Sequence, residues 1–574
     1  MGWGRRGGVH VTSPKTLGVA DVTDFYTFYT ITMAAPTRHP PDGPLIGTLQ
    51  ASGRVEVFLG IPFAKPPVGS LRWQPPQPPK SWTAPRLATT SAPACPQSAT
   101  YYPPVGARSE DCLYLNVFTA VNVNAGKQNP VMVYLHGGSF TNGGANEDRL
   151  NASFTVDKQP NLVVVVIQYR LGVLGFSGGH ALGGATSGNY GVQDQRAALQ
   201  WVRRSIHAFG GDPSRVLLAG QSAGAGSVSV QLVLKRSAGL FSRALILSGA
   251  FGHWITQSLD QADVNLKTLA RAVGCAPDTG VDAVCLRTRD AMFLVNKTLS
   301  IGYGPTTHTE ELADEPWALA QARGGLAPGV PIILGSTAED GTSPQAAGGV
   351  NASGVQLRSW VHTYFGPSGL SYSAALVANL TRTYASSAAL NSTRIPNGKG
   401  SPAYWRSIRL LADAEMACPA RRAAQWRTAS AHAAMTANGA VASAYWYLWG
   451  HSPVYGTAGN MRCAYHASDI PFLFHVLKAK DRQYQLNSPE EVVLSSQLLG
   501  YVASFAETGV PSVRGAPRWA AFDDSSQSRL LLRAEGAEGG VRLESRSGNV
   551  SDYWEQMRVC ELWDAIGDRS EPII

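Results

Sequence analysis

The sequence predicts an α/β fold built on a large, mostly parallel sheet flanked by helices. Apolar runs without polar positions recur along the chain, as in parallel strands that are buried on both faces, at 131–135, 162–167, 244–247 and 332–334. Helical patterns lie between these runs, notably at 193–206 and 223–235, and strands that alternate with helices indicate a parallel sheet. Hydrophobic residues make up 44% of the 574 positions and charged residues 15%, so the chain can bury a large core.

The other predicted elements lie before and after this region. Alternating polar and apolar residues at 55–60 and 110–118 predict two early strands, and the C-terminal part is expected to contain a strand at 444–448 and helices at 489–506 and 552–566. Length alone suggests several domains, but the motifs described below are spread through one region without a linker. We therefore expect an N-terminal extension over 1–43, ill-ordered or a targeting segment, followed by one α/β domain over 44–574.

The segment around Ser222 carries the clearest chemical signal. An apolar run at 215–219 precedes Gly220-Gln221-Ser222-Ala223-Gly224, and the helical pattern follows. The pattern G-x-S-x-G between a strand and a helix is typical of a nucleophile elbow, in which a sharp turn exposes the serine hydroxyl at a helix N-terminus. The alternative is an ordinary tight turn, and the strand–turn–helix context favours the elbow.

Several further motifs occur in a characteristic order. They are Glu110-Asp111-Cys112-Leu113-Tyr114-Leu115-Asn116-Val117, His136-Gly137-Gly138-Ser139-Phe140, Tyr169-Arg170-Leu171-Gly172-Val173-Leu174-Gly175-Phe176, Gly188-Asn189-Tyr190-Gly191-Val192-Gln193-Asp194-Gln195 and 209–213. With the elbow, they resemble the type-B carboxylesterase/lipase family, the relatives of cholinesterases. The resemblance runs from about residue 44 to the C-terminus and is weakest between 345 and 440. It implies an α/β-hydrolase fold and serine ester hydrolysis.

The resemblance also implies a catalytic triad in the order serine, acid, histidine. A serine hydroxyl needs a base, and the base needs an orienting partner. The position of the family's acid is Asp340, where most relatives carry Glu; Glu339 is the second choice. The base is His466, which precedes Asp469 and an apolar run. The alternatives are a solvated loop carboxylate and a surface histidine.

Backbone donors for the oxyanion follow from the same resemblance. By motif position they are the N–H groups of Gly138, Ser139 and Ala223. Ser139 replaces the usual third glycine, which reduces the freedom of that residue's backbone but leaves its N–H in place. His136 is expected to shape the turn and not to titrate in the mechanism.

The cysteines and sequons favour an oxidising, glycosylating compartment. The resemblance implies the pairs Cys95–Cys112, Cys275–Cys285 and Cys418–Cys560, although the sequence alone allows other connectivities. Cys463 is then unpaired, as a buried inert thiol, a free thiol near the site or an intermolecular link. Six sequons occur, at Asn151, Asn296, Asn351, Asn379, Asn391 and Asn549. We expect a secreted glycoprotein, although the N-terminus has no clear signal peptide and is also compatible with a transit signal or a misplaced start codon.

The expected substrate is an uncharged ester. The net charge of +8 without a dense basic run argues against nucleic-acid binding and weakly against a cationic substrate. The loop between Cys95 and Cys112 offers only Tyr101 and Tyr102, with no tryptophan for a cation, and Gln221 replaces a frequent Glu. Trp254 is expected either to line the acyl pocket or to lie in the core.

We expect no metal, no cofactor and no membrane-spanning segment, and the sequence does not define an oligomeric state. Two alternatives to an esterase are a catalytically silent adhesion protein on the same fold and a lipase acting at interfaces.

Overall fold

The computed structural model describes most of the chain from Ala35 onward. The described residues are 35–98, 106–121, 128–277, 280–322, 327, 329–342, 374–386, 402–434, 442–454, 463–480, 485–534, 540–546 and 551–567. The compact unit begins at Pro36. Its first strand, β1 (Thr37–Arg38), pairs with β2 (Leu45–Ile46) and lies within the range predicted as an extension, so residues 37 and 38 are paired with the start of the predicted domain.

A mixed sheet of eleven strands runs through this unit. Its spatial order is β16-β15-β14-β13-β10-β9-β7-β8-β6-β4-β3, and the strands from β15 to β8 in this order run parallel. Antiparallel strands form both edges, because β16 pairs with β15 at one side and β6, β4 and β3 follow β8 at the other. The bounds are β3 Thr48–Leu49, β4 Val55–Pro62, β6 Tyr114–Ala120, β7 Asn129–Leu135, β8 Val163–Ile167, β9 Gly211–Gln221, β10 Arg243–Leu247, β13 Ile332–Thr337, β14 Ala444–Trp449, β15 Arg529–Leu532 and β16 Arg542–Glu544.

The stretches 131–135, 163–167 and 216–219 of the central strands have no polar position because both faces of the sheet are covered there. Along β7, Val131, Val133 and Leu135 belong to one core cluster, whereas Met132 and Tyr134 belong to the other. The neighbouring strands divide in the same way, since successive side chains of a strand point to opposite faces. The continuous apolar runs of the sequence therefore mark strands buried on both sides.

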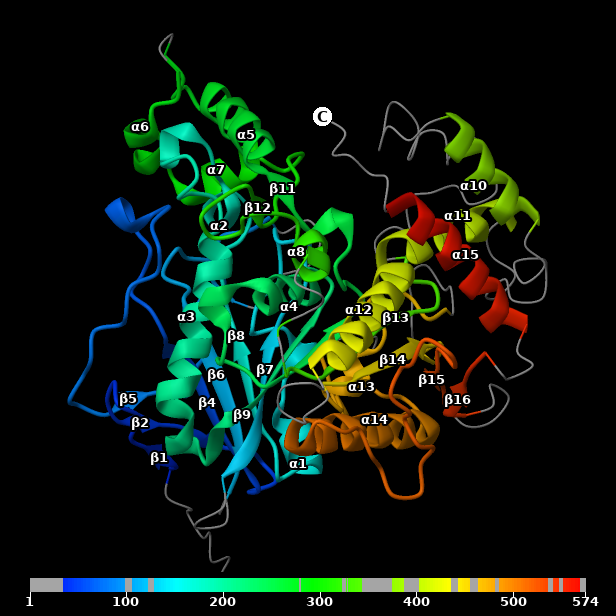
Figure 1. Cartoon of the computed structure of the whole chain (residues 1–574). Coiled ribbons are helices and arrows are strands. Elements are labelled where there is room, and N and C mark those ends of the chain that lie inside the picture. Colours follow the sequence, from blue (N-terminus) through cyan, green and yellow to red (C-terminus); the bar gives the residue numbers. More distant parts are fainter. Residues whose placement is uncertain are drawn as a thin grey trace, which may run out of the picture. The chain divides into compact units, whose positions relative to one another are not determined.

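Helices cover each face. Residues of α3 (Tyr190–Ser205), α4 (Ala223–Val233) and α12 (Cys418–Ala434) belong to the first cluster, and residues of α1 (Ser153–Lys158), α13 (Ile470–Leu473) and α14 (Pro489–Thr508) to the second. Figure 1 shows α3 and α4 along the sheet and α14 near α1. This arrangement is the predicted α/β fold.

The remaining helices and short strands extend from this framework. Their bounds are α2 Gly172–Phe176, α5 Leu259–Ala272, α6 Ala283–Thr288, α7 Ala291–Lys297, α8 Pro316–Ala322, α10 Ala374–Ser386, α11 Pro402–Ala412, α15 Ser551–Gly567, β5 Arg86–Leu87, β11 Gln257–Ser258 and β12 Thr306–Thr307. A π-helical turn, Asp413–Ala417, joins α11 to α12. Among the helices that the structure describes, none is both long and apolar enough to cross a bilayer.

Three disulfides tie these elements together. They join Cys95 to Cys112, Cys275 to Cys285 and Cys418 to Cys560, which are the pairs that the resemblance implied. The first two close short loops, whereas the third links the start of α12 to α15 across 142 residues of sequence.

Candidate active site

The candidate site lies at the carboxyl edge of the parallel strands. β7 is followed by the His136–Phe140 loop, β9 by Ser222 and β13 by the loop that carries Asp340. Parallel strands bring their carboxyl ends to one edge, and ligands of open α/β sheets bind there. The fold thus brings together three segments that are spread from residue 136 to residue 340 of the sequence.

Ser222 occupies a strained turn between β9 and α4. Its φ of 57° and ψ of −126° lie in a region that L-residues rarely adopt. Its N–H donates to the carbonyl of Leu247 on β10 at 2.9 Å, and its carbonyl accepts from the N–H of Gly226 in the first turn of α4 at 2.9 Å. The sheet and the helix therefore hold this conformation from both sides.

The two glycines of the motif are required by close approach. A Cβ atom on Gly220 would lie 2.4 Å from the carbonyl of Gly224, and a Cβ on Gly224 would lie 2.0 Å from the carbonyl oxygen of Leu135. Both separations are far below van der Waals contact, so α4 can start this close to β7 and β9 only without these side chains.

His466 and Asp340 form the other part of the site. The imidazole Nδ1 lies 2.5 Å from Asp340 Oδ1, and Asp340 Oδ2 accepts the N–H of Thr337 at 2.8 Å. The carboxylate side chain is fully buried and that of His466 is 17% exposed. Because the carboxylate accepts from Nδ1, the other ring nitrogen, Nε2, carries the lone pair of the neutral imidazole.

Glu339, the second choice for the acid, has a different place in the structure. Its Oε2 accepts the N–H of Ala464 at 2.8 Å, and its own N–H donates to the carbonyl of Ala464 at 3.1 Å. The N–H of His466 also donates to the carbonyl of Thr342 at 2.9 Å. These bonds join the acid loop to the histidine loop, which explains how the shorter aspartate reaches the imidazole.

Gln221 contacts His466 in a way that the sequence did not predict. Its amide Nε2 lies 3.1 Å from the imidazole Nε2. Gln221 ends β9 and is 2% exposed. Within the described part of the chain, the Ser222 hydroxyl makes no hydrogen bond, so the amide of Gln221 is the group that faces the basic nitrogen in this structure.

The loop after β7 presents a row of unused N–H groups. Gly138, Ser139 and Phe140 have φ values of 116°, 52° and 58°, and their consecutive positive φ values form a tight concave turn. Over the described residues, the N–H groups of Gly138, Ser139 and Ala223 reach no acceptor of the protein. Ser139 keeps its donor, at the cost of a left-handed conformation that glycine would adopt without strain.

His136 supports that loop. It is 1% exposed, its ring stacks on Tyr169 with centroids 4.4 Å apart, and the Tyr169 hydroxyl donates to its carbonyl at 2.7 Å. Burial lowers the pKa of His136, so the ring is neutral at physiological pH. Its position fits a role in shaping the turn.

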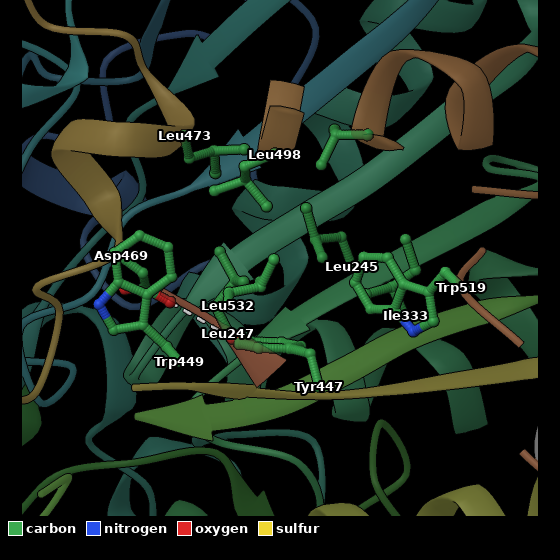
Figure 2. A pocket seen from close by; sticks show the side chains of 11 residues that line it. Leu245, Leu247, Ile333, Tyr447, Trp449, Asp469, Leu473, Leu498, Trp519 and Leu532 are labelled. Carbon is green, nitrogen blue, oxygen red and sulfur yellow. Dashed lines mark hydrogen bonds between the residues drawn. The ribbon is translucent and has the colours of Figure 1, made fainter. Parts of the chain in front are cut away.

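Asp469 lies near the His466–Asp340 pair. It is 1% exposed and accepts from the Tyr447 hydroxyl at 3.3 Å, the bond drawn in Figure 2. Burial, with a smaller contribution from the charge of Asp340, raises the pKa of Asp469 to about 7. It lines a cavity of about 10 Å³ whose other walls are apolar or aromatic, with Leu245, Leu247 and Ile333 on the sheet side. A carboxyl in such a place is favoured in its neutral form.

Helix α11 packs over the two loops of the site. Tyr404 and Ile408 form a small buried cluster with Cys463 and Tyr465. Cys463 is the free cysteine of the described chain, and burial raises the pKa of its thiol to about 12, which makes it unreactive. Trp254 packs against the first core cluster and donates its indole N–H to the carbonyl of Glu415 at 3.2 Å.

Other residues of the sequence motifs hold the framework in place. Arg170 and Asp194 form a buried bidentate ion pair, with both N–O distances at 2.7 Å. Asn116 accepts the N–H of Gly60 at 3.0 Å and donates to the carbonyl of Ala145 at 3.2 Å. These motif residues join neighbouring elements and lie outside the group of candidate catalytic side chains.

No group of ligands suited to a metal ion occurs among the residues that the structure describes. Tyr101 and Tyr102, which bear on the expectation of an uncharged substrate, lie outside those residues.

A parallel sheet, a serine at a strand–helix turn and a histidine–carboxylate pair at the same edge define an α/β-hydrolase. Comparison with known proteins gives the family. A model of the carboxylesterase family matches residues 34–550. The chain belongs to this family and is a carboxylic ester hydrolase.

Its relatives include characterised esterases. Cocaine esterase of Homo sapiens is 32% identical over 548 residues, which cover 88% of this chain and 89% of that protein. Para-nitrobenzyl esterase of Bacillus subtilis (strain 168) is 30% identical over 506 residues, or 84% of this chain and 92% of that protein. The solved structure of a thermophilic PNB esterase has a TM-score of 0.72 and 26% identity, and the match covers 91% of this chain and 100% of that one.

Proposed function

We propose that this enzyme hydrolyses uncharged carboxylic esters through an acyl-enzyme formed on Ser222. The observation that carries the proposal is the 2.5 Å approach of Asp340 Oδ1 to His466 Nδ1. That contact directs the lone pair of Nε2 toward the end of β9, where Ser222 follows the Gln221 amide that lies 3.1 Å from Nε2. Nucleophile, base and orienting acid are then in the order that serine hydrolysis requires.

The proposed reaction has two halves. In the first, His466 Nε2 accepts the proton of Ser222 as the oxygen attacks the ester carbonyl, and the imidazolium then gives this proton to the departing alcohol. In the second, His466 takes a proton from water as the water attacks the acyl group, and the imidazolium then returns this proton to the Ser222 oxygen as the acid leaves. The buried Asp340 holds the ring and stabilises its positive charge in both halves.

The N–H groups of Gly138, Ser139 and Ala223 are proposed to bind the oxyanion. Their support is the absence of a protein acceptor for these groups among the described residues, and the position of Ala223 next to Ser222 at the start of α4. Preorganised donors of this kind act without reorganisation, and the loss of one typically costs about 3 kcal/mol in the barrier.

The proposal of an uncharged substrate rests on the neutral side chain of Gln221 beside the base. We expect hydrolysis of p-nitrophenyl butyrate by the purified enzyme, and a kcat/KM for butyrylcholine at least about tenfold below that for a neutral butyrate of similar size, because the site offers no carboxylate at this position for the cation. Assays with both esters check this, and a preference for the choline ester would contradict it. Activity that appears only with emulsified long-chain esters would favour the interfacial lipase.

We also propose that the protein is a secreted glycoprotein. Three disulfides support an oxidising compartment. Asn151 and Asn296 are exposed, as an acceptor asparagine must be. A loss of apparent mass after glycosidase treatment of the protein made in a secreting eukaryotic cell tests this proposal, and an unchanged mass would contradict it.

A further inference from the structure

The side-chain amide of Gln221 lies against Nε2 of His466, the nitrogen that accepts the proton of Ser222 in the proposed mechanism. The neutral imidazole of His466 has its N–H on Nδ1, toward Asp340, so Nε2 can only accept. The group 3.1 Å from Nε2 is the amide nitrogen of Gln221, a donor. This orientation of the amide is the one consistent with the neutral ring, since the amide oxygen would face a lone pair.

The surroundings of Gln221 keep the amide in place. The residue is 2% exposed at the end of β9. A Cβ atom on Gly137 would lie 3.0 Å from the Gln221 Oε1 and 2.8 Å from its carbonyl oxygen, so the bare backbone of Gly137 makes room for the amide. The histidine loop is fixed separately, by the bonds of Glu339 and Thr342 to Ala464 and His466.

We propose that Gln221 is a positioning residue that holds His466 in its neutral, Nδ1–H form and releases Nε2 to Ser222 when substrate binds. This inference rests on the proposed function, because it assigns a role relative to the base of that mechanism. A hydrogen-bond donor to the lone pair of an imidazole favours the neutral ring over the imidazolium.

Ionisable groups on the elements around His466 bear on any pH profile. Asp340 bonds to His466, and Asp469 lies within its electrostatic reach. The acid loop, β14, α11 and the histidine loop also carry Glu339, Tyr447, Tyr404, Arg409, Cys463 and Tyr465. All of them are unchanged by a substitution at Gln221. A comparison of variants at this one position therefore isolates the contribution of the amide.

The test is the pH profile of kcat/KM on p-nitrophenyl butyrate for the full chain and three variants. Gln221→Met keeps the size of the side chain but removes the donor, and we expect the midpoint of the acid limb to rise by about half a pH unit. Gln221→Glu keeps the shape and supplies a carboxylate, which favours the imidazolium, and we expect a rise of about one unit or more. Gln168→Met is the matched control: this glutamine is also buried, follows the end of β8, which is separated from β9 by β7, and donates to the carbonyl of Pro93. Its midpoint should equal that of the unchanged enzyme.

The outcomes separate this inference from the proposed function. Midpoints in the order unchanged enzyme, Gln221→Met, Gln221→Glu support the inference. A Gln221→Met midpoint equal to that of the unchanged enzyme, or a Gln221→Glu profile without a shift, overturns it, because a merely structural amide would alter the rate or the stability but not the midpoint. If instead the unchanged enzyme shows no acid limb, or Ser222→Ala retains activity, the proposed function itself fails.

Discussion

At the scale of single residues, two buried carboxyl groups near His466, those of Asp340 and Asp469, have different surroundings. Asp340 is a partner of His466 and Thr337, whereas Asp469 accepts from Tyr447 next to an apolar cavity. The sequence motif predicted Asp340 because it precedes a glycine after a strand, and His466 because it precedes Asp469 and an apolar run. It could not predict the contact between Gln221 and His466. That contact joins positions 245 residues apart and depends on how the bonds of Glu339 hold the histidine loop to the acid loop.

The raised pKa of Asp469 predicts a stability effect with a definite sign. The folded state holds this proton up to about pH 7, whereas the aspartate of the unfolded chain has a pKa of 3.8. The stabilisation is therefore complete below about pH 4, falls as the pH rises to about 7 and is absent above. Asp469→Asn mimics the neutral form. We expect the free energy of unfolding of the variant, minus that of the unchanged enzyme, to increase from about pH 4 to pH 8 by at most about 4 kcal/mol.

Denaturant unfolding of both proteins across this range measures the difference. Carboxyl groups that do not interact with Asp469 titrate equally in the two proteins, so they cancel. A difference that is independent of pH, or one that decreases as the pH rises, would show that Asp469 is ionised in the folded enzyme at neutral pH.

At the scale of elements, the packing of α4 against β7 determines where the serine is placed. The glycines at 220 and 224 can be recognised in the sequence as part of a motif. The structure shows why a side chain is excluded: Gly220 lies against the carbonyl of Gly224, and Gly224 against the carbonyl of Leu135. The continuous apolar runs predicted β7 to β10 correctly because these strands are buried on both faces. The two-residue strand β1 was not predicted, since a pair of residues carries no periodic signal.

Gly224→Ala is expected to destabilise the enzyme and impair catalysis together. The new Cβ would meet the Leu135 carbonyl oxygen at 2.0 Å, so α4 must move away from β7. Overpacking of this kind costs about 3 kcal/mol, and the movement displaces the N–H of Ala223. Gly226→Ala is the matched control in the same helix, because its nearest neighbour is the Ile255 side chain at 2.9 Å, which can shift.

Thermal unfolding and esterase assays of both variants check this prediction. The expected result is a large loss of stability and activity for Gly224→Ala and a small change for Gly226→Ala. Equal effects of the two substitutions would mean that the approach of α4 to β7 is not the constraint.

At the scale of the whole chain, the disulfide between Cys418 and Cys560 closes the longest loop of the three disulfides. It spans 142 residues, compared with 10 for Cys275–Cys285. In the chain-entropy account, closing loops of these lengths contributes about 5 and about 3 kcal/mol, respectively. Replacing both cysteines of a pair by alanine should therefore lower the free energy of unfolding more for the pair 418/560. Denaturant unfolding of the two double variants compares them, and the reverse order would contradict this account.

The part of the structure that the sequence predicts differs along the chain. The resemblance is densest from residue 110 to 227, where the motifs form strand ends, ion pairs and the elbow. It is weakest between 345 and 440. That region includes α11, whose Tyr404 and Ile408 pack beside the histidine loop. Residues that only cover a site need suitable size and polarity, and many sequences satisfy that need, so no motif marks them.

Covalent labelling with a fluorophosphonate, followed by mass spectrometry of the digested enzyme, tests whether Ser222 is the nucleophile activated by His466. We expect one adduct, on the peptide that contains Ser222, and no labelling of Ser222→Ala. Labelling of His466→Ala should be slowed by at least about a thousandfold because the base is absent. An adduct on another serine, or rapid labelling of Ser222 without His466, would contradict it.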